Sequence, residues 1–316
     1  MDHEPVLADQ VAAFLVPALE HGGVVVDATL GRGGHARRIL EAAPAAELIG
    51  VDRDPVALEA SRANLSAHAD RIRLVGDNFE NLEAVLERFG VASVRGVLLD
   101  LGVSSPQLDD PARGFSFREP GPLDMRMDPT AGLSAEVVVN EYSETDLARV
   151  ISRFGEERFA RRIAKAIVRK RPLRDTVELA ETIKEAVPAA TRRTGGHPAR
   201  RTFQAVRIEV NGELKALDEA LRVTLDALEY HGRAVVLSYH SLEDRIVKTT
   251  FNEAARGCVC PPDFPVCQCG AEARVRVLTR KPVRPAPQEI DANPRSSAAK
   301  LRAIEKLERS PEVESA

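Results

Sequence analysis

Short apolar runs alternate with helical patterns along the first hundred residues, and this alternation limits the possible folds more than any other feature. We expect strands over four segments, residues 24–28, 48–52, 72–76 and 94–101. The intervals carry helical patterns, one opening at the glycine turn LGRGGH and two more over residues 55–67 and 82–89. Apolar strands joined by helices form a parallel sheet that is covered on both faces. The sequence therefore predicts an α/β fold with a doubly wound sheet.

The alternation breaks after this region. Residues 102–132 are polar and rich in Pro and Gly, and residues 134–184 carry a helical pattern. Strand-like runs return only at 234–237, after a helical pattern over 214–230, and again at 275–279. We infer one α/β domain interrupted by a helical insert. The expected division is 1–104 (first part), 105–212 (insert, including the long loop), 213–300 (second part) and 301–316 (the end of a helix over Ser297–Glu308, then a flexible tail).

The insert differs from the rest of the chain in charge. Residues 149–207 contain 16 Lys or Arg against 6 Asp or Glu, an excess of 10 positive charges on a chain whose net charge is −4. Such an excess favours binding to a phosphate backbone. A solvated helix face is the alternative interpretation.

No segment has the composition of a targeting or membrane element. The first 23 residues contain acidic side chains and no basic leader, and no run approaches 18 apolar residues. We expect a cytoplasmic protein.

A glycine-rich turn follows the first predicted strand. In DATLGRGGH, Gly31, Gly33 and Gly34 stand where backbone must approach a ligand closely. Asp52, at the end of the second strand, is 21 residues beyond Gly31 and is placed to bind ribose hydroxyls. NAD-dependent dehydrogenases and S-adenosylmethionine (AdoMet) methyltransferases share this arrangement. The alternative is a set of packing glycines and a helix-capping Asp.

Two further strand ends carry residues suited to a cofactor. Phe79, in GDNFENL after the third strand, is placed to stack on an adenine ring. Asp100 closes the fourth strand, at the edge where open α/β sheets bind ligands, and can face both a cationic cofactor and a substrate.

Longer motifs carry a resemblance to a known family. They occur together and in order: HEPVL (3–7), DATLGRGGH (27–35), GVDRDP (50–55), GDNFENL (76–82), LLDLGVSSPQLD (98–109), RGFSF (113–117), LDMRMD (123–128), FQAVRIEVNGEL (203–214) and SYHSLEDRIVK (238–248). Together they resemble the RsmH (MraW) family of AdoMet-dependent methyltransferases, which act on N4 of a cytidine in bacterial 16S ribosomal RNA. The resemblance implies a Rossmann-like class I methyltransferase fold with an inserted all-helical substrate-binding domain.

The resemblance also implies partners and cofactor contacts. The expected partner is 16S rRNA within the small ribosomal subunit, with neither membrane nor DNA. The implied AdoMet contacts are Gly33, Gly34, His35, Asp52, Phe79, Asp100 and Gln107. His35 and Gln107 are assigned on the resemblance alone.

Methyl transfer to an exocyclic amine needs acceptors that orient the amine. Asp100 and the loop around Ser105 can supply them. Tyr239 and His240, at the end of the fifth strand, can contact the base and take up a proton or bind phosphate. In the alternative, Tyr239 packs in the core and Ser241 caps the next helix.

The aromatic pair Phe115 and Phe117 has two interpretations as well. It could form a platform for unstacked nucleotides or anchor the long loop to the core.

All four cysteines lie in one short stretch, CVCPPDFPVCQC: Cys258, Cys260, Cys267 and Cys269. Four thiolates on a turn can hold zinc, although C-x-C spacing is tighter than the usual C-x-x-C. The alternative is a Pro-rich surface loop with reduced thiols, and no metal is assigned to the active site.

Two other function classes share parts of this pattern. An NAD-dependent oxidoreductase would respond to NADH, whereas a methyltransferase would respond to S-adenosylhomocysteine. A non-enzymatic ribosome-assembly factor would bind RNA and transfer no methyl group.

Overall fold

A computed structural model of the chain describes residues 5–189, 196–258, 260, 269 and 271–308. It separates into two compact units, which we call the first unit (1–102 and 215–316) and the second unit (103–214). The assignment of residues 105–212 as an RNA-binding domain stays a prediction.

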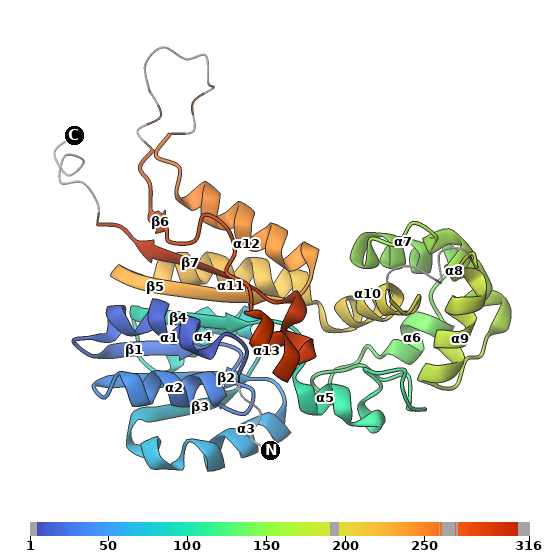
Figure 1. Cartoon of the computed structure of the whole chain (residues 1–316), viewed down its shortest axis with the longest axis horizontal. Helices are drawn as coiled ribbons and strands as arrows, with labels where there is room; N and C mark the ends of the chain where they lie inside the picture. Colours follow the sequence, from blue (N-terminus) through green and yellow to red (C-terminus); the bar gives the residue numbers. More distant parts are fainter. Residues whose placement is uncertain (1–4, 190–195, 259, 261–268, 270, 309–316) are drawn as a thin grey trace. The chain divides into compact units, whose positions relative to one another are not determined.

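The first unit is built on a seven-stranded sheet of order β3-β2-β1-β4-β5-β7-β6 (Figure 1). Five strands are parallel, and β7 runs antiparallel to its neighbours β5 and β6. The strands span Gly23–Asp27 (β1), Ala46–Asp52 (β2), Ile72–Gly76 (β3), Val94–Asp100 (β4), Leu228–Ser238 (β5), Val275–Val277 (β6) and Lys300–Lys306 (β7). This topology confirms the predicted doubly wound α/β fold.

Helices cover both faces of this sheet. Successive strand residues point to opposite sides, so each face has apolar side chains to bury. Val26 and Val97 lie in one buried cluster with side chains of α4, α11 and α12, whereas Val25 and Leu98 lie in another with α1, α2 and α3. The helices with residues in the first unit are α1 (Ala8–Leu15), α2 (Gly34–Ala42), α3 (Pro55–Asn64), α4 (Leu82–Arg88), α11 (Glu213–Ala227), α12 (Ser241–Ala254) and α13 (Pro287–Ala292). Because both faces are buried, consecutive strand residues are apolar, which accounts for the apolar runs seen in the sequence.

The terminal helix predicted over Ser297–Glu308 is wrong, since residues 300–306 form β7. Its sequence, KLRAIEK, is rich in helix formers, but pairing with β5 and β6 outweighs that weak local preference. Buried charges on β7 are paired: Arg302 donates to Asp244 at 2.7 Å, and Glu305 accepts from Arg233 at 2.9 Å. These partners are remote in sequence, so a local pattern cannot reveal them.

The second unit is helical and has its own core. Its helices are α5 (Ser105–Asp109), α6 (Ala135–Asn140), α7 (Glu144–Gly155), α8 (Ala160–Lys170), α9 (Thr176–Ala186) and α10 (Arg200–Asn211). The predicted periodicity is seen in α8, where Ile163 and Ile167 are fully buried. Short 3₁₀ turns in the two units lie at Val16–Leu19, Ser66–Arg71, Phe79–Asn81, Pro111–Arg113 and Pro294–Ala298.

The long loop after β4 is tied to the second unit's core. Phe115 is buried there, and Phe117 packs against the rings of His197 and Phe203, with centroids 4.6 and 4.8 Å away. Gly114 has a φ of +71°, and a Cβ at this position would lie 2.1 Å from the Pro122 carbonyl oxygen. The structure thus favours the loop-anchor interpretation of both phenylalanines over the nucleotide platform.

Among the described helices, none has both the length and the apolar character required to cross a bilayer.

Candidate functional site

Polar side chains gather at the carboxyl edge of the first unit's sheet. Asp27, Asp52 and Asp100 are the last residues of β1, β2 and β4, and Tyr239 follows the last residue of β5. Because these strands are parallel and adjacent in register, their ends meet at one edge. The fold therefore brings together four positions that are up to 212 residues apart in sequence.

The glycine turn is held in place by Asp52. The Gly31 amide donates to Asp52 Oδ2 at 2.7 Å, and the Asp54 amide donates to Oδ1 at 2.8 Å. Gly33 has a φ of +77°, and a Cβ there would press on Leu65 at 3.0 Å. Burial raises the pKa of Asp52, while the two amide bonds partly offset that effect. Asp52 thus holds the turn, and glycine is required at position 33 by the positive φ and by the contact with Leu65.

His35 lies in the first turn of α2 and is 6% exposed. Its Nε2 lies 3.4 Å from Asp100 Oδ2, and neither ring nitrogen has a hydrogen-bond partner among the described residues. A buried polar group without a partner costs about 1–3 kcal/mol. A bound ligand that hydrogen-bonds this imidazole would remove the penalty, which fits His35 as a cofactor contact.

Asp100 is the centre of this group. Its side chain is 25% exposed, its Oδ1 accepts a hydrogen bond from the Tyr239 hydroxyl at 2.9 Å, and its amide donates to Thr29 Oγ1 at 2.5 Å. Burial, followed by the charge of Asp100 and this hydrogen bond, raises the pKa of Tyr239 well above its usual value of 10. The phenol therefore stays neutral and acts as a donor that orients the carboxylate.

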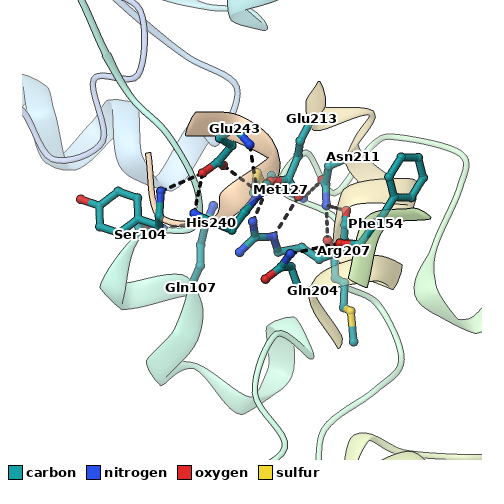
Figure 2. Close-up of polar contacts among 12 residues, drawn as sticks. Ser104, Gln107, Met127, Phe154, Gln204, Arg207, Asn211, Glu213, His240 and Glu243 are labelled. Atoms are coloured by element: carbon teal, nitrogen blue, oxygen red, sulfur yellow. Dashed lines mark hydrogen bonds and ion pairs between the residues drawn. The ribbon is translucent and has the colours of Figure 1, made fainter. Parts of the chain in front are cut away.

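Glu243, in the first turn of α12 beside His240 (Figure 2), positions Tyr239. Its Oε2 accepts from the Tyr239 amide at 2.8 Å and from the His240 amide at 3.1 Å. The N-cap of α12 is His240, whose Nδ1 accepts from the Glu243 amide at 3.3 Å, so the alternative interpretation, in which Ser241 caps this helix, is wrong by one residue. The catalytic role of His240 stays a prediction.

Asp27 is a site residue that the sequence analysis missed. It is 1% exposed, and its carboxylate accepts from the Thr29 amide at 3.2 Å. Burial raises the pKa of Asp27 from 3.8 to about 7, an effect that nearby His35 reduces. Its position at the end of a predicted strand, like those of Asp52 and Asp100, was the available signal.

Phe79 lies at the carboxyl end of β3, where it begins a 3₁₀ turn and packs partly against the core. Asp77 Oδ1 accepts from Asn78 N and from Asn81 Nδ2, both at 2.7 Å. Asp77 and Asn78 therefore shape the turn that presents Phe79. Stacking on an adenine ring stays a prediction.

Ser105 and Gln107 belong to α5 in the second unit. Gln107 is buried, and its Oε1 accepts from the Ser104 amide at 3.1 Å in a capping box (Figure 2). The cofactor contact of Gln107 and the catalytic role of Ser105 stay predictions.

The motif at 203–214 fastens the end of α10 to the long loop (Figure 2). Arg207 makes a bidentate ion pair with Glu213, at 2.9 and 2.8 Å. Asn211 accepts from the Met127 amide at 2.8 Å and donates to the Met125 carbonyl at 2.8 Å. These residues organise the second unit, which gives the motif a structural role.

The helix α8 presents a cationic face. Arg161, Arg162, Lys165 and Arg169 are exposed, and among the described residues none of them has an acidic partner within 4.0 Å. Unpaired exposed cations on one helix suit a polyanion.

Comparisons with known proteins agree with one another. A family model described as the MraW methylase family matches residues 1–307. The chain is 50% identical over 310 residues to a "Ribosomal RNA small subunit methyltransferase H" of Heliobacterium mobile, covering 96% of this chain and 99% of that protein. It is 52% identical over 309 residues to a protein of the same name from Acidothermus cellulolyticus, covering 96% and 94%.

A solved structure of an rRNA methylase from Streptococcus thermophilus aligns with a TM-score of 0.44 at 14% identity, covering 98% of this chain and 99% of that one.

Proposed function

This chain belongs to the MraW methylase family, and from that premise we propose that it methylates N4 of a cytidine in 16S ribosomal RNA. The chain is an AdoMet-dependent methyltransferase. One observation supports the proposed chemistry most directly: the half-buried Asp100 carboxylate is held by Tyr239 at the carboxyl edge of the sheet, beside the glycine turn.

The residues of this edge fit AdoMet. The glycine turn at the end of β1 is held by Asp52, at the position where such folds bind their cofactor. His35 offers buried ring nitrogens, and Asp52 lies where ribose hydroxyls bind in such folds. When bound, AdoMet supplies an electrophilic methyl group on a positively charged sulfur. The carboxylate of Asp100 complements that charge.

Asp100 also suits the substrate. The N4 lone pair of cytosine is delocalised into the ring, so the amine attacks only when it is well oriented. Asp100 Oδ1 accepts from Tyr239, and Oδ2 lies 3.4 Å from His35 Nε2. A carboxylate oxygen has two lone pairs, so Oδ2 can still accept an N4 hydrogen and keep it out of the line of attack. Tyr239 fixes the rotamer of Asp100, and Glu243 fixes the backbone of Tyr239.

The substrate is proposed to be rRNA presented by the small ribosomal subunit, in the cytoplasm where subunits assemble. The exposed cations of α8 support a polyanionic partner.

Methyl transfer from radiolabelled AdoMet tests this function. Small subunits from cells that lack this activity are incubated with the protein, and mass spectrometry of nuclease fragments locates the methyl group. We expect one N4-methylcytidine in 16S rRNA. Label on another base, or on protein, would contradict the proposal.

The same preparation separates the rival classes. A thermal shift with S-adenosylhomocysteine and none with NADH is expected. RNA binding without any transfer would instead indicate an assembly factor.

A further inference from the structure

The segment between α12 and β6 has no part in methyl transfer as described above. Its ends are joined, because the Arg274 amide donates to the Ala254 carbonyl at 2.8 Å. All four cysteines of the chain lie within it. Three of them, Cys258, Cys260 and Cys269, are described, and their Sγ atoms all lie within 4.8 Å of one another. Cys267 lies outside the described residues.

The sulfur spacing matches one metal ion. Cys258 Sγ and Cys269 Sγ are 3.8 Å apart, far longer than the roughly 2.05 Å of a disulfide bond. Two sulfurs bound to one tetrahedral zinc ion, each about 2.3 Å from the metal, lie about 3.8 Å from each other. The geometry therefore suits thiolates that share one tetrahedral ion, without a covalent bond between them.

A second contact supports ligation. The Ala271 amide lies 3.5 Å from Cys269 Sγ and donates to it. Hydrogen bonds of this kind stabilise the negative charge of a metal-bound thiolate. An iron–sulfur cluster fits less well, since its thiolates bind different iron atoms and would stand further apart.

The local sequence explains what an ion would do there. The 20 residues from 255 to 274 include three prolines but only three large apolar side chains, Val259, Phe264 and Val266. A composition with so few apolar side chains favours stabilisation by a cross-link, which a bound metal can supply.

We propose that Cys258, Cys260 and Cys269 bind one structural zinc ion that closes this loop. The ion stands apart from methyl transfer, and the proposal does not depend on the proposed function.

Metal analysis of the untagged full chain, purified without chelator, tests the proposal. We expect about one zinc ion per chain. The double variant Cys258→Ser/Cys269→Ser should lose it, whereas Glu272→Ser, an exposed change in the same segment, should retain it. Unchanged zinc content in the double variant would place the ion elsewhere and overturn the site.

Measurements on the unmodified chain avoid the risk that the double variant fails to fold. Cobalt substitution should produce the visible absorption of tetrahedral thiolate coordination, and because the chain has no other cysteines, those bands report this loop alone. Thiol titration should be slow until a chelator is added. A metal-free chain with rapidly reacting thiols, or one whose intact mass shows a disulfide, would refute the proposal.

Discussion

Replacing Asp100 by Asn is the sharpest test of the site, because it removes one charge and almost nothing else. The amide oxygen can still accept the Tyr239 hydroxyl, which now lies 2.9 Å from Oδ1. The free energy of unfolding should therefore change by less than about 1 kcal/mol. Removal of one preorganised electrostatic group typically lowers turnover by about 10²–10³-fold, equivalent to about 2.7–4 kcal/mol.

Asp100→Ala is the matched comparison. It removes the acceptor as well as the charge, so the partly buried Tyr239 hydroxyl loses its partner at a cost of up to about 1–3 kcal/mol. In a domain of this size each kcal/mol lowers the melting temperature by about 2–4 °C. Both variants should thus lose at least about 10²-fold in turnover. Only the Ala variant should also be less stable than the unmodified protein.

Single-turnover methylation of small subunits, with calorimetric melting of the same samples, measures both quantities. AdoMet affinity, measured by titration calorimetry, separates a binding effect from a chemical one. If Asp100→Asn methylates within about threefold of the unmodified protein, the carboxylate's charge is irrelevant to the reaction and the assignment fails.

Three further changes follow from the geometry. Tyr239→Phe should lower kcat about tenfold with little effect on AdoMet affinity, since it removes one orienting hydrogen bond; an unchanged kcat would contradict this role. Asp27 ionises near 3.8 when unfolded and near 7 when folded, so its stabilising contribution is complete below pH 3.8 and is lost as the pH rises towards 7. Denaturant unfolding should therefore show Asp27→Asn gaining about 2 kcal/mol on the unmodified protein between about pH 5 and pH 7, and parallel pH profiles would refute the shift. Replacing Arg161, Arg162 and Arg169 by Glu should weaken rRNA binding. The slope of log affinity against log salt concentration, measured by filter binding, should fall by an amount equivalent to two or more phosphate contacts. AdoMet affinity should stay unchanged. As a control, reversing three exposed arginines of the first unit, Arg62, Arg88 and Arg256, should weaken RNA binding far less. If both triple variants lose equal affinity, net charge alone explains the binding.

Much of the first unit could be predicted because its signals are local. The inner strands β1, β2 and β4 are buried on both faces over most of their length, so each appears as an apolar run. The glycine turn needs positive φ at Gly31 and Gly33, which only glycine adopts without strain. Asp52 and Asp100 were found because a carboxylate that closes an apolar strand is conspicuous in any sequence.

Long-range contacts account for what the sequence left hidden. β7 is a strand because β5 and β6 pair with it and because Arg302 forms an ion pair with Asp244, 58 residues away. The positioning role of Glu243 depends on a contact formed in the folded structure, because its carboxylate accepts a hydrogen bond from the amide of Tyr239.

The sequence by itself determined the doubly wound sheet, its insert and the family, since periodicity, strand-end residues and motif order are all written along the chain. Tertiary structure alone decided which side chains meet: Asp100 contacts His35 and Tyr239, which are 65 and 139 residues away. The physical reason is that the parallel strands place their carboxyl ends side by side, and a distance in space of this kind has no counterpart in sequence spacing.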